Sequence, residues 1–137
     1  MKVNELMIDD WVYRTDFNTP VPSKIIGMEV VNYDKMEYVV DVFNKNGYNV
    51  QLYLNEIEPI PLTPEILEKI GFETQPNIGY IIDDWDGTQI IYDSRNHNLR
   101  IIKNYKVCLD IETFDDISVH ELQHALRLCG IDKTITL

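Results

Sequence analysis

The sequence predicts an α+β protein in which two groups of antiparallel strands are separated by a short helix and followed by a second helix. Two strand-turn-strand patterns predict the sheets, since alternating apolar residues flank Asn46-Gly47 and again Asp86-Gly87. Such a pair between alternating runs is a strong hairpin signal, because both central residues of a type I′ turn need positive φ. A helix start at Thr63 and a helix stop at Gly130 supply the rest of the pattern.

The N-terminal part of the chain predicts a small antiparallel β-barrel-like unit. Residues 36–43 and 48–54 alternate apolar and polar side chains on either side of Asn46-Gly47. Residues 10–14 and 23–31 are two further expected strands, separated by a segment with two prolines. Several short strands within such a span are typical of a small barrel or a strongly bent sheet. We therefore assign residues 1–60 to a barrel-like subdomain.

The remaining residues, 61–137, predict a connecting helix, a second antiparallel β-meander and a C-terminal helix packed on it. Thr63 can cap the first helix, Pro64 suits its first position, and Gly71 suits its end. The expected strands and the last helix cover residues 79–85, 88–92, 99–103, 105–111 and 118–129. No linker separates the two parts, so we expect two subdomains in one short chain.

Charge and composition exclude several classes of function. The 137 residues include 12 Lys and Arg against 23 Asp and Glu, a formal net charge of −11. Such a balance disfavours direct nucleic-acid binding and attachment to an anionic membrane. No apolar run reaches the roughly 20 residues of a membrane span, and the opening lacks the apolar region of a signal peptide. With Cys108 and Cys129 as the two cysteines, both expected to be small core residues, we predict a cytoplasmic location and reduced thiols.

One segment resembles a catalytic motif. His120-Glu121-Leu122-Gln123-His124 matches the H-E-x-x-H pattern of zinc hydrolases. Two histidines four residues apart lie on one helix face and can share a zinc ion, while the glutamate acts as general base on the bound water. A zinc-dependent hydrolase with His120 and His124 as metal ligands and Glu121 as base is therefore one hypothesis.

The surroundings of this motif favour a plain amphipathic helix. Its apolar stripe must face the sheet, so both imidazoles are expected to point to solvent. Ser118 and Glu121 fit a capping box, which is a structural reason for the glutamate. A third ligand is not evident at positions 127 and 130, which are Arg and Gly. More distant candidate ligands stay open: His97, Cys108, Asp110, Glu112 and Asp115. We accordingly expect no metal and no cofactor.

Most aromatic residues of the barrel-like unit are expected in the core or in cross-strand pairs, and some are candidates for an exposed binding face. Tyr and Trp are common interface anchors, and the barrel-like unit is rich in them. The candidate interaction surface comprises Trp11, Tyr13, Tyr48 and Tyr53. An acidic protein favours a basic partner, and an acidic DNA mimic that inhibits a DNA-binding protein is a further hypothesis.

An acidic cluster, Asp83, Asp84 and Asp86, resembles part of a calcium loop, but a hairpin turn explains it.

Three blocks resemble small uncharacterised proteins of gut bacteria and their prophages or mobile elements. The opening is Asn4-Glu5-Leu6 to Val12-Tyr13, the middle block is Ile57-Glu58-Pro59-Ile60-Pro61-Leu62-Thr63 with Gly71-Phe72, and the last is Val119-His120-Glu121-Leu122-Gln123. Those proteins also have histidine at the position of His120. They often have another residue at the position of Glu121, and commonly asparagine at that of His124. The resemblance implies no catalytic residue. We expect a non-enzymatic, phage- or mobile-element-related module that binds a protein partner or self-associates.

Overall fold

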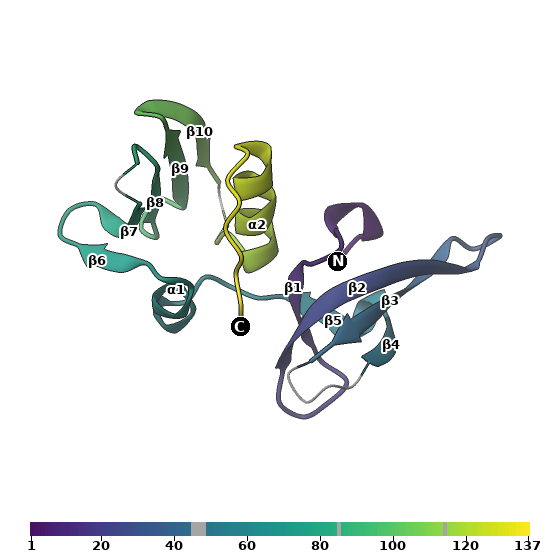
Figure 1. Cartoon of the computed structure of the whole chain (residues 1–137). Coiled ribbons are helices and arrows are strands. Elements are labelled where there is room, and N and C mark those ends of the chain that lie inside the picture. Colours follow the sequence, from purple (N-terminus) through teal and green to yellow (C-terminus); the bar gives the residue numbers. More distant parts are fainter. Residues whose placement is uncertain (45–48, 85, 114) are drawn as a thin grey trace. The chain divides into compact units, whose positions relative to one another are not determined.

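The protein is described by a computed structural model that covers residues 1–44, 49–84, 86–113 and 115–137. These residues form two compact units, Met1–Ile60 and Pro61–Leu137. Each unit contains a five-stranded antiparallel sheet, and the second unit also contains two α-helices (Figure 1). The α+β class predicted from the sequence is confirmed.

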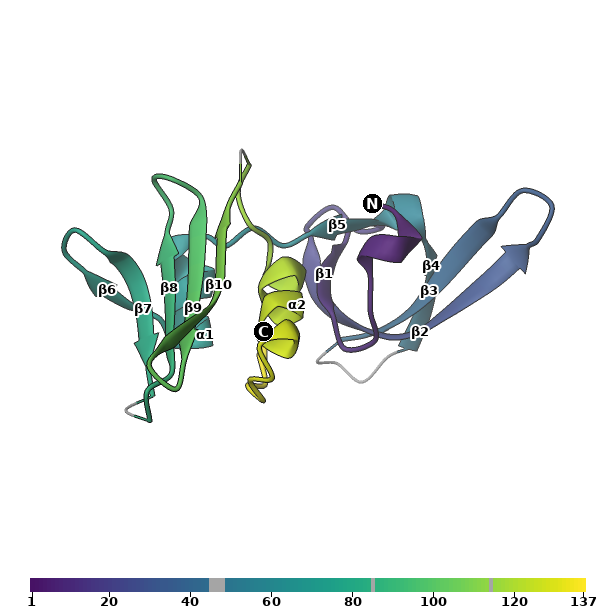
Figure 2. The ribbon, with the colours of Figure 1, turned by 90° about the horizontal axis from the view of Figure 1, so that it is seen from above.

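The first unit is built from short strands in the order β4-β3-β2-β1-β5. Its elements are η1 (Val3–Glu5), β1 (Trp11–Arg14), β2 (Val21–Asn32), β3 (Glu37–Phe43), β4 (Asn49–Tyr53), η2 (Leu54–Glu56) and β5 (Ile57–Pro59). The sheet is strongly bent (Figure 2), but among the described residues no ladder joins β4 to β5, so a closed barrel is not shown. The turn predicted at Asn46-Gly47 lies outside the described residues.

Period-two alternation builds the core of this unit. Val40 and Val42 of β3 point to the same side, and each pairs with an apolar residue of β4. The buried core cluster consists of Leu6, Val12, Ile25, Val40, Val42, Leu52 and Ile57. Pro22 lies within β2 although proline cannot donate to a ladder. It is tolerated because it pairs only with Tyr13 of β1, and the ladder to β3 begins further along, at Lys24.

An ion pair between buried Arg14 and exposed Asp16 follows β1. The Arg14 side chain is 4% exposed, and its Nε donates to Oδ1 of Asp16 over 2.8 Å. The guanidinium also lies 4.4 Å from the centre of the Phe17 ring, a cation–π contact. The hydrogen bond from Arg14 holds the pKa of Asp16 below its usual value. A carboxylate that is ionised in this way keeps the buried arginine paired.

Replacing Asp16 by asparagine is expected to reduce stability near neutral pH and to make it less sensitive to acid. The folded-state pKa of Asp16 is lower than the unfolded one, so the stabilisation is present above pH of about 4 and is lost as pH falls through the folded value. The difference in free energy of unfolding between wild type and Asp16→Asn should therefore shrink in acid. Urea titrations at several pH values measure it, with Asp34→Asn, a change at an exposed carboxylate of the same unit, as control. A difference that does not vary with pH would contradict this assignment.

The second unit is a meander with the strand order β10-β9-β8-β7-β6. Its elements are α1 (Pro64–Ile70), β6 (Glu73–Gln75), β7 (Gly79–Asp83), β8 (Gln89–Asp93), β9 (Asn98–Lys103), β10 (Lys106–Glu112) and α2 (Val119–Leu128). The predicted helix ends are confirmed: the Thr63 hydroxyl accepts a hydrogen bond from the Ile66 amide, and Gly71 has φ of 116°. The short strand β6 was not predicted, because a three-residue edge strand has no sequence periodicity to detect.

The two faces of this second sheet differ in character. One face is buried and carries Ile82, Ile90, Tyr92, Leu99 and Ile101. Lys103, two residues after Ile101, points to the same side and reaches the end of α2, where its Nζ donates to the Cys129 carbonyl over 3.1 Å. This is the helix side of the sheet. Among the described residues, no helix combines the length and the apolar character that crossing a lipid bilayer requires.

Candidate functional site

The glutamate of the H-E-x-x-H segment is part of the helix cap. Ser118 precedes α2, and its hydroxyl accepts a hydrogen bond from the Glu121 amide over 3.4 Å. In return, Oε1 of Glu121 accepts from the Ser118 amide at 3.3 Å and from the Ser118 hydroxyl at 2.8 Å. The predicted capping box is confirmed. Glu121 therefore satisfies backbone and hydroxyl donors at the helix start.

The expectation that both imidazoles point to solvent is wrong for His120. This side chain is 5% exposed, and its Nδ1 lies 3.0 Å from the Ser118 hydroxyl oxygen. The Ser118 hydroxyl donates its proton to Glu121, so it can only accept a hydrogen bond from the His120 ring. The hydrogen-bond network therefore assigns the ring proton to Nδ1 of His120. A helical wheel accounts for the stripe that faces the sheet, but it does not reveal what covers the other side of a helix.

The two histidines are not arranged as a ligand pair with a third donor. Their ring centres lie 5.7 Å apart and the rings meet edge to face at 72°. Within the described parts of the chain, no three His, Cys, Asp or Glu side chains are grouped so that they could hold a metal ion. Among the distant candidates, His97 Nδ1 lies 3.0 Å from Asp116, and Asp110 is bonded to Asn98 and Arg100. The geometry thus supports a structural role for the segment.

The residues of the aromatic surface predicted in the first unit differ in exposure. Trp11 is only 6% exposed and Tyr13 is half-buried. Tyr53, on the peripheral strand β4, is 55% exposed and is accessible as predicted. Tyr48 lies outside the described residues. Trp11 is therefore a core residue, and the assignment of this tryptophan to an interaction surface is corrected.

A different surface stands out on the second sheet, on the side opposite the helices. We call it the open face. Two rows of cross-strand neighbours form its centre: Asp83, Gln89, Ile102 and Val107, and beside them Ile81, Ile91, Arg100 and Asp110, of which Ile81 is itself buried. Ile102 is half-buried, and Val107 is 60% exposed. Apolar side chains therefore lie in the middle of this face with charged groups around them.

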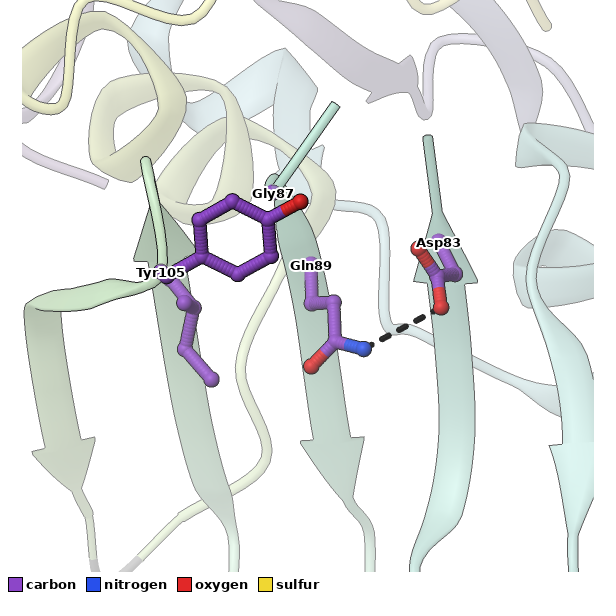
Figure 3. Close-up of a pocket in the computed structure, with 5 residues that line it drawn as sticks. Asp83, Gly87, Gln89 and Tyr105 are labelled. Carbon is purple, nitrogen blue, oxygen red and sulfur yellow. Dashed lines mark hydrogen bonds between the residues drawn. The ribbon is translucent and has the colours of Figure 1, made fainter. Parts of the chain in front are cut away.

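A shallow cavity of about 350 Å³ lies on the open face (Figure 3). It is lined by Asp83, Gly87, Gln89, Ile102 and Tyr105. Within it, Nε2 of Gln89 donates to Oδ2 of Asp83 over 3.1 Å, which fixes the orientation of both side chains. The cavity therefore has a polar wall and an apolar floor beside an aromatic ring.

Tyr105 is held at this cavity by local backbone structure. It occupies the turn between β9 and β10, where Asn104 and Tyr105 both have positive φ. Its amide donates to the Gly87 carbonyl over 3.1 Å, and its ring covers Gly87 so closely that a Cβ there would approach it to 2.8 Å. The ring is nevertheless 83% exposed. Sequence reasoning missed this residue, although an aromatic side chain in a two-residue turn after asparagine was a signal for an exposed ring.

Carboxylates lie on the open face beside the apolar centre, at Asp83, and further along the strands, at Asp93, Asp110 and Glu112. Hydrogen bonds from Arg95 hold the pKa of Asp93 below its usual value, and those from Asn98 and Arg100 do the same for Asp110. Asp93 and Asp110 each form an ion pair with an arginine, and Asp83 and Glu112 are further carboxylates of this face. The arginine pairs also interrupt the row of carboxylates on this face.

Comparisons of the chain with protein-family models, curated proteins and solved structures give no match. The chemistry of the described surfaces therefore carries the functional argument.

Proposed function

We propose that this protein is a non-enzymatic interaction module that binds a basic segment of a partner protein on the open face. The observation that supports it is the centre of that face, where Ile102, Val107 and Tyr105 expose apolar surface within a rim of carboxylates. Apolar anchors within a polar rim are the usual anatomy of a protein-binding patch.

The charge of the chain favours a basic partner. With a net charge of −11, long-range attraction steers Lys- and Arg-rich segments towards the protein and repels acidic ones. Asp83 and Glu112 are placed on the rim to meet such cations. The cavity beside Tyr105 suits one apolar or aromatic side chain of the same segment. The partner we propose is thus a short basic segment with an apolar anchor.

Two finer assignments belong to the same proposal. We propose that the first unit is a small barrel, because η2 turns the chain from β4 to β5 and β5 pairs with β1 at the far side of the bent sheet. We also propose a phage- or mobile-element-related, cytoplasmic protein. The resemblance of the opening, middle and C-terminal blocks supports this origin.

The test uses two labelled peptides and two substitutions. One peptide combines arginines with a central leucine, and the other replaces each arginine by glutamate. We expect wild type to bind only the cationic peptide, and Val107→Lys to weaken binding at least about tenfold, because the substitution removes apolar contact and adds repulsion. Leu128→Lys, at a 79% exposed leucine on α2, is the matched control and should bind as wild type does. Fluorescence anisotropy at increasing salt measures the affinities, which should fall as screening increases.

Two outcomes would overturn the proposal. If neither peptide binds, or if Val107→Lys and Leu128→Lys behave alike, the open face is not the binding surface. If protein purified without chelator contains equimolar zinc that His124→Ala loses, the hydrolase hypothesis replaces the interaction module.

A further inference from the structure

The two cysteines of the second unit differ in their exposure to solvent. Cys108 is exposed on the edge strand β10, and Cys129 is buried at the end of α2. Neither forms a disulfide in this structure. Because the sequence places them far apart and without a C-x-x-C pattern, only the fold can show whether they are neighbours.

An irregularity in the edge strand positions Cys108. The β9–β10 register shifts between Val107 and Leu109, so Cys108 is the extra residue of a bulge. Val107 pairs with Ile102 on the open face, and Leu109 pairs with Ile101 on the helix side. A bulge re-aims side chains that strict alternation would send to the other face. Counted back from Leu109, strict alternation would place Cys108 on the open face. Because the bulge breaks the alternation at this point, Cys108 can face α2 instead.

Lys103 holds the end of α2 beside the same strands. Its Nζ donates to the carbonyls of Cys129 and Gly130, each over 3.1 Å. In the ladder, Lys103 pairs with Lys106, two residues before Cys108. The helix end that carries Cys129 is thus anchored next to the part of β10 that carries Cys108.

The two thiols also interact with each other. Burial raises the pKa of Cys129 to about 11, and a hydrogen bond with Cys108 contributes to the increase. Cys129 is accordingly protonated at neutral pH and, being buried, is shielded from reagents. Cys108 is the exposed member of the pair and is the one that a reagent meets first.

We propose that Cys108 and Cys129 form a reversible intramolecular disulfide by exchange with a low-molecular-weight disulfide such as oxidised glutathione. The Cys108 thiolate attacks one sulfur of the reagent, a mixed disulfide forms and one glutathione leaves as thiolate. Cys129 then loses its proton to solvent and attacks the Cys108 sulfur, which releases the second glutathione. The two protein thiols give up two electrons in total, and the reagent is reduced to two thiols.

The bond would join the edge strand to the C-terminal helix. A cross-link between residues distant in sequence removes conformations from the unfolded chain, so the oxidised protein should unfold at a higher temperature than the reduced one. The open face lies on the other side of the sheet, so peptide binding there should be retained. This separates a failure of the disulfide proposal from a failure of the proposed function.

The test treats the folded protein with oxidised glutathione and then maps peptides by mass spectrometry. We expect wild type to lose both thiols, to gain one Cys108–Cys129 linked peptide without bound glutathione, and to return to the free thiols with dithiothreitol. Cys129→Ser should keep a glutathione adduct on Cys108, because no second thiol resolves it. Cys108→Ser should react little, since Cys129 is buried.

Three results would overturn the proposal: a lasting glutathione adduct on wild-type Cys108, a dimer linked through Cys108, or unchanged thiols in wild type while Cys129→Ser reacts. Should Cys129→Ser fold poorly by circular dichroism, Cys129→Ala, which keeps a small apolar group in the buried position, serves as the second variant.

Discussion

Replacing Ile101 by alanine is expected to destabilise the second unit by about 3 kcal/mol. Ile101 has no exposed surface and lies in the middle of β9, where it pairs with Ile90 of β8 and Leu109 of β10. Truncation leaves a cavity that neighbours on two strands cannot fill without moving the sheet. Urea unfolding followed by circular dichroism measures the loss, and hydrogen exchange of the β8 and β9 amides locates it in this unit.

The adjacent residue is the matched control. Ile102 is on the same strand but on the open face, where it is half-buried at the cavity beside Tyr105. Ile102→Ala should cost only about 1 kcal/mol of stability, because solvent already reaches part of the side chain. It should, however, weaken binding of the cationic peptide, whereas folded Ile101→Ala should bind normally. If the two substitutions exchanged these effects, the assignment of the faces would be wrong.

Replacing Ser118 by alanine is expected to cost about 2 kcal/mol. Its buried hydroxyl caps α2, donates to the Glu121 carboxylate and accepts from His120. Without it, the Glu121 amide and a buried ring nitrogen both lose a partner. Thermal unfolding measures the effect, and Ser94→Ala, at an exposed loop serine of the same unit, is the control.

The same variant separates the two interpretations of the H-E-x-x-H segment. If Glu121 is a capping residue, Ser118→Ala and Glu121→Ala should each lower stability, and their effects should not add, because both break one reciprocal cap. If Glu121 is a catalytic base, Glu121→Ala should leave stability unchanged. Additive losses, or no loss in Glu121→Ala, would contradict the capping role.

Local features of the fold could be predicted from the sequence because they depend on neighbouring residues. Thr63 and Gly71 end their helix through hydrogen bonds and dihedral angles within one turn of the chain. Ser118 and Glu121 form their cap over three residues. The pairing of the strands on either side of Asp86-Gly87 follows from alternation and is confirmed. The type I′ turn expected there is not, because Gly87 has positive φ but Asp86 does not. The α+β class is the sum of such local choices.

The candidate site could not be predicted in this way, because burial depends on residues that are distant in the sequence. His120 was expected to point to solvent and Trp11 was a candidate for an interaction surface, yet both are buried. The open face, with Tyr105 above Gly87, exists only once strands from separate hairpins are aligned.

The sequence by itself thus determined both α-helices with their caps, most of the strands, the strong negative charge and the motif to be tested. The tertiary structure alone decided which side chains reach solvent, which carboxylates meet an arginine and which thiols become neighbours. The physical reason is that hydrogen bonds of turns and caps form within a few residues, whereas exposure and pairing are set by packing between segments that the chain brings together from afar.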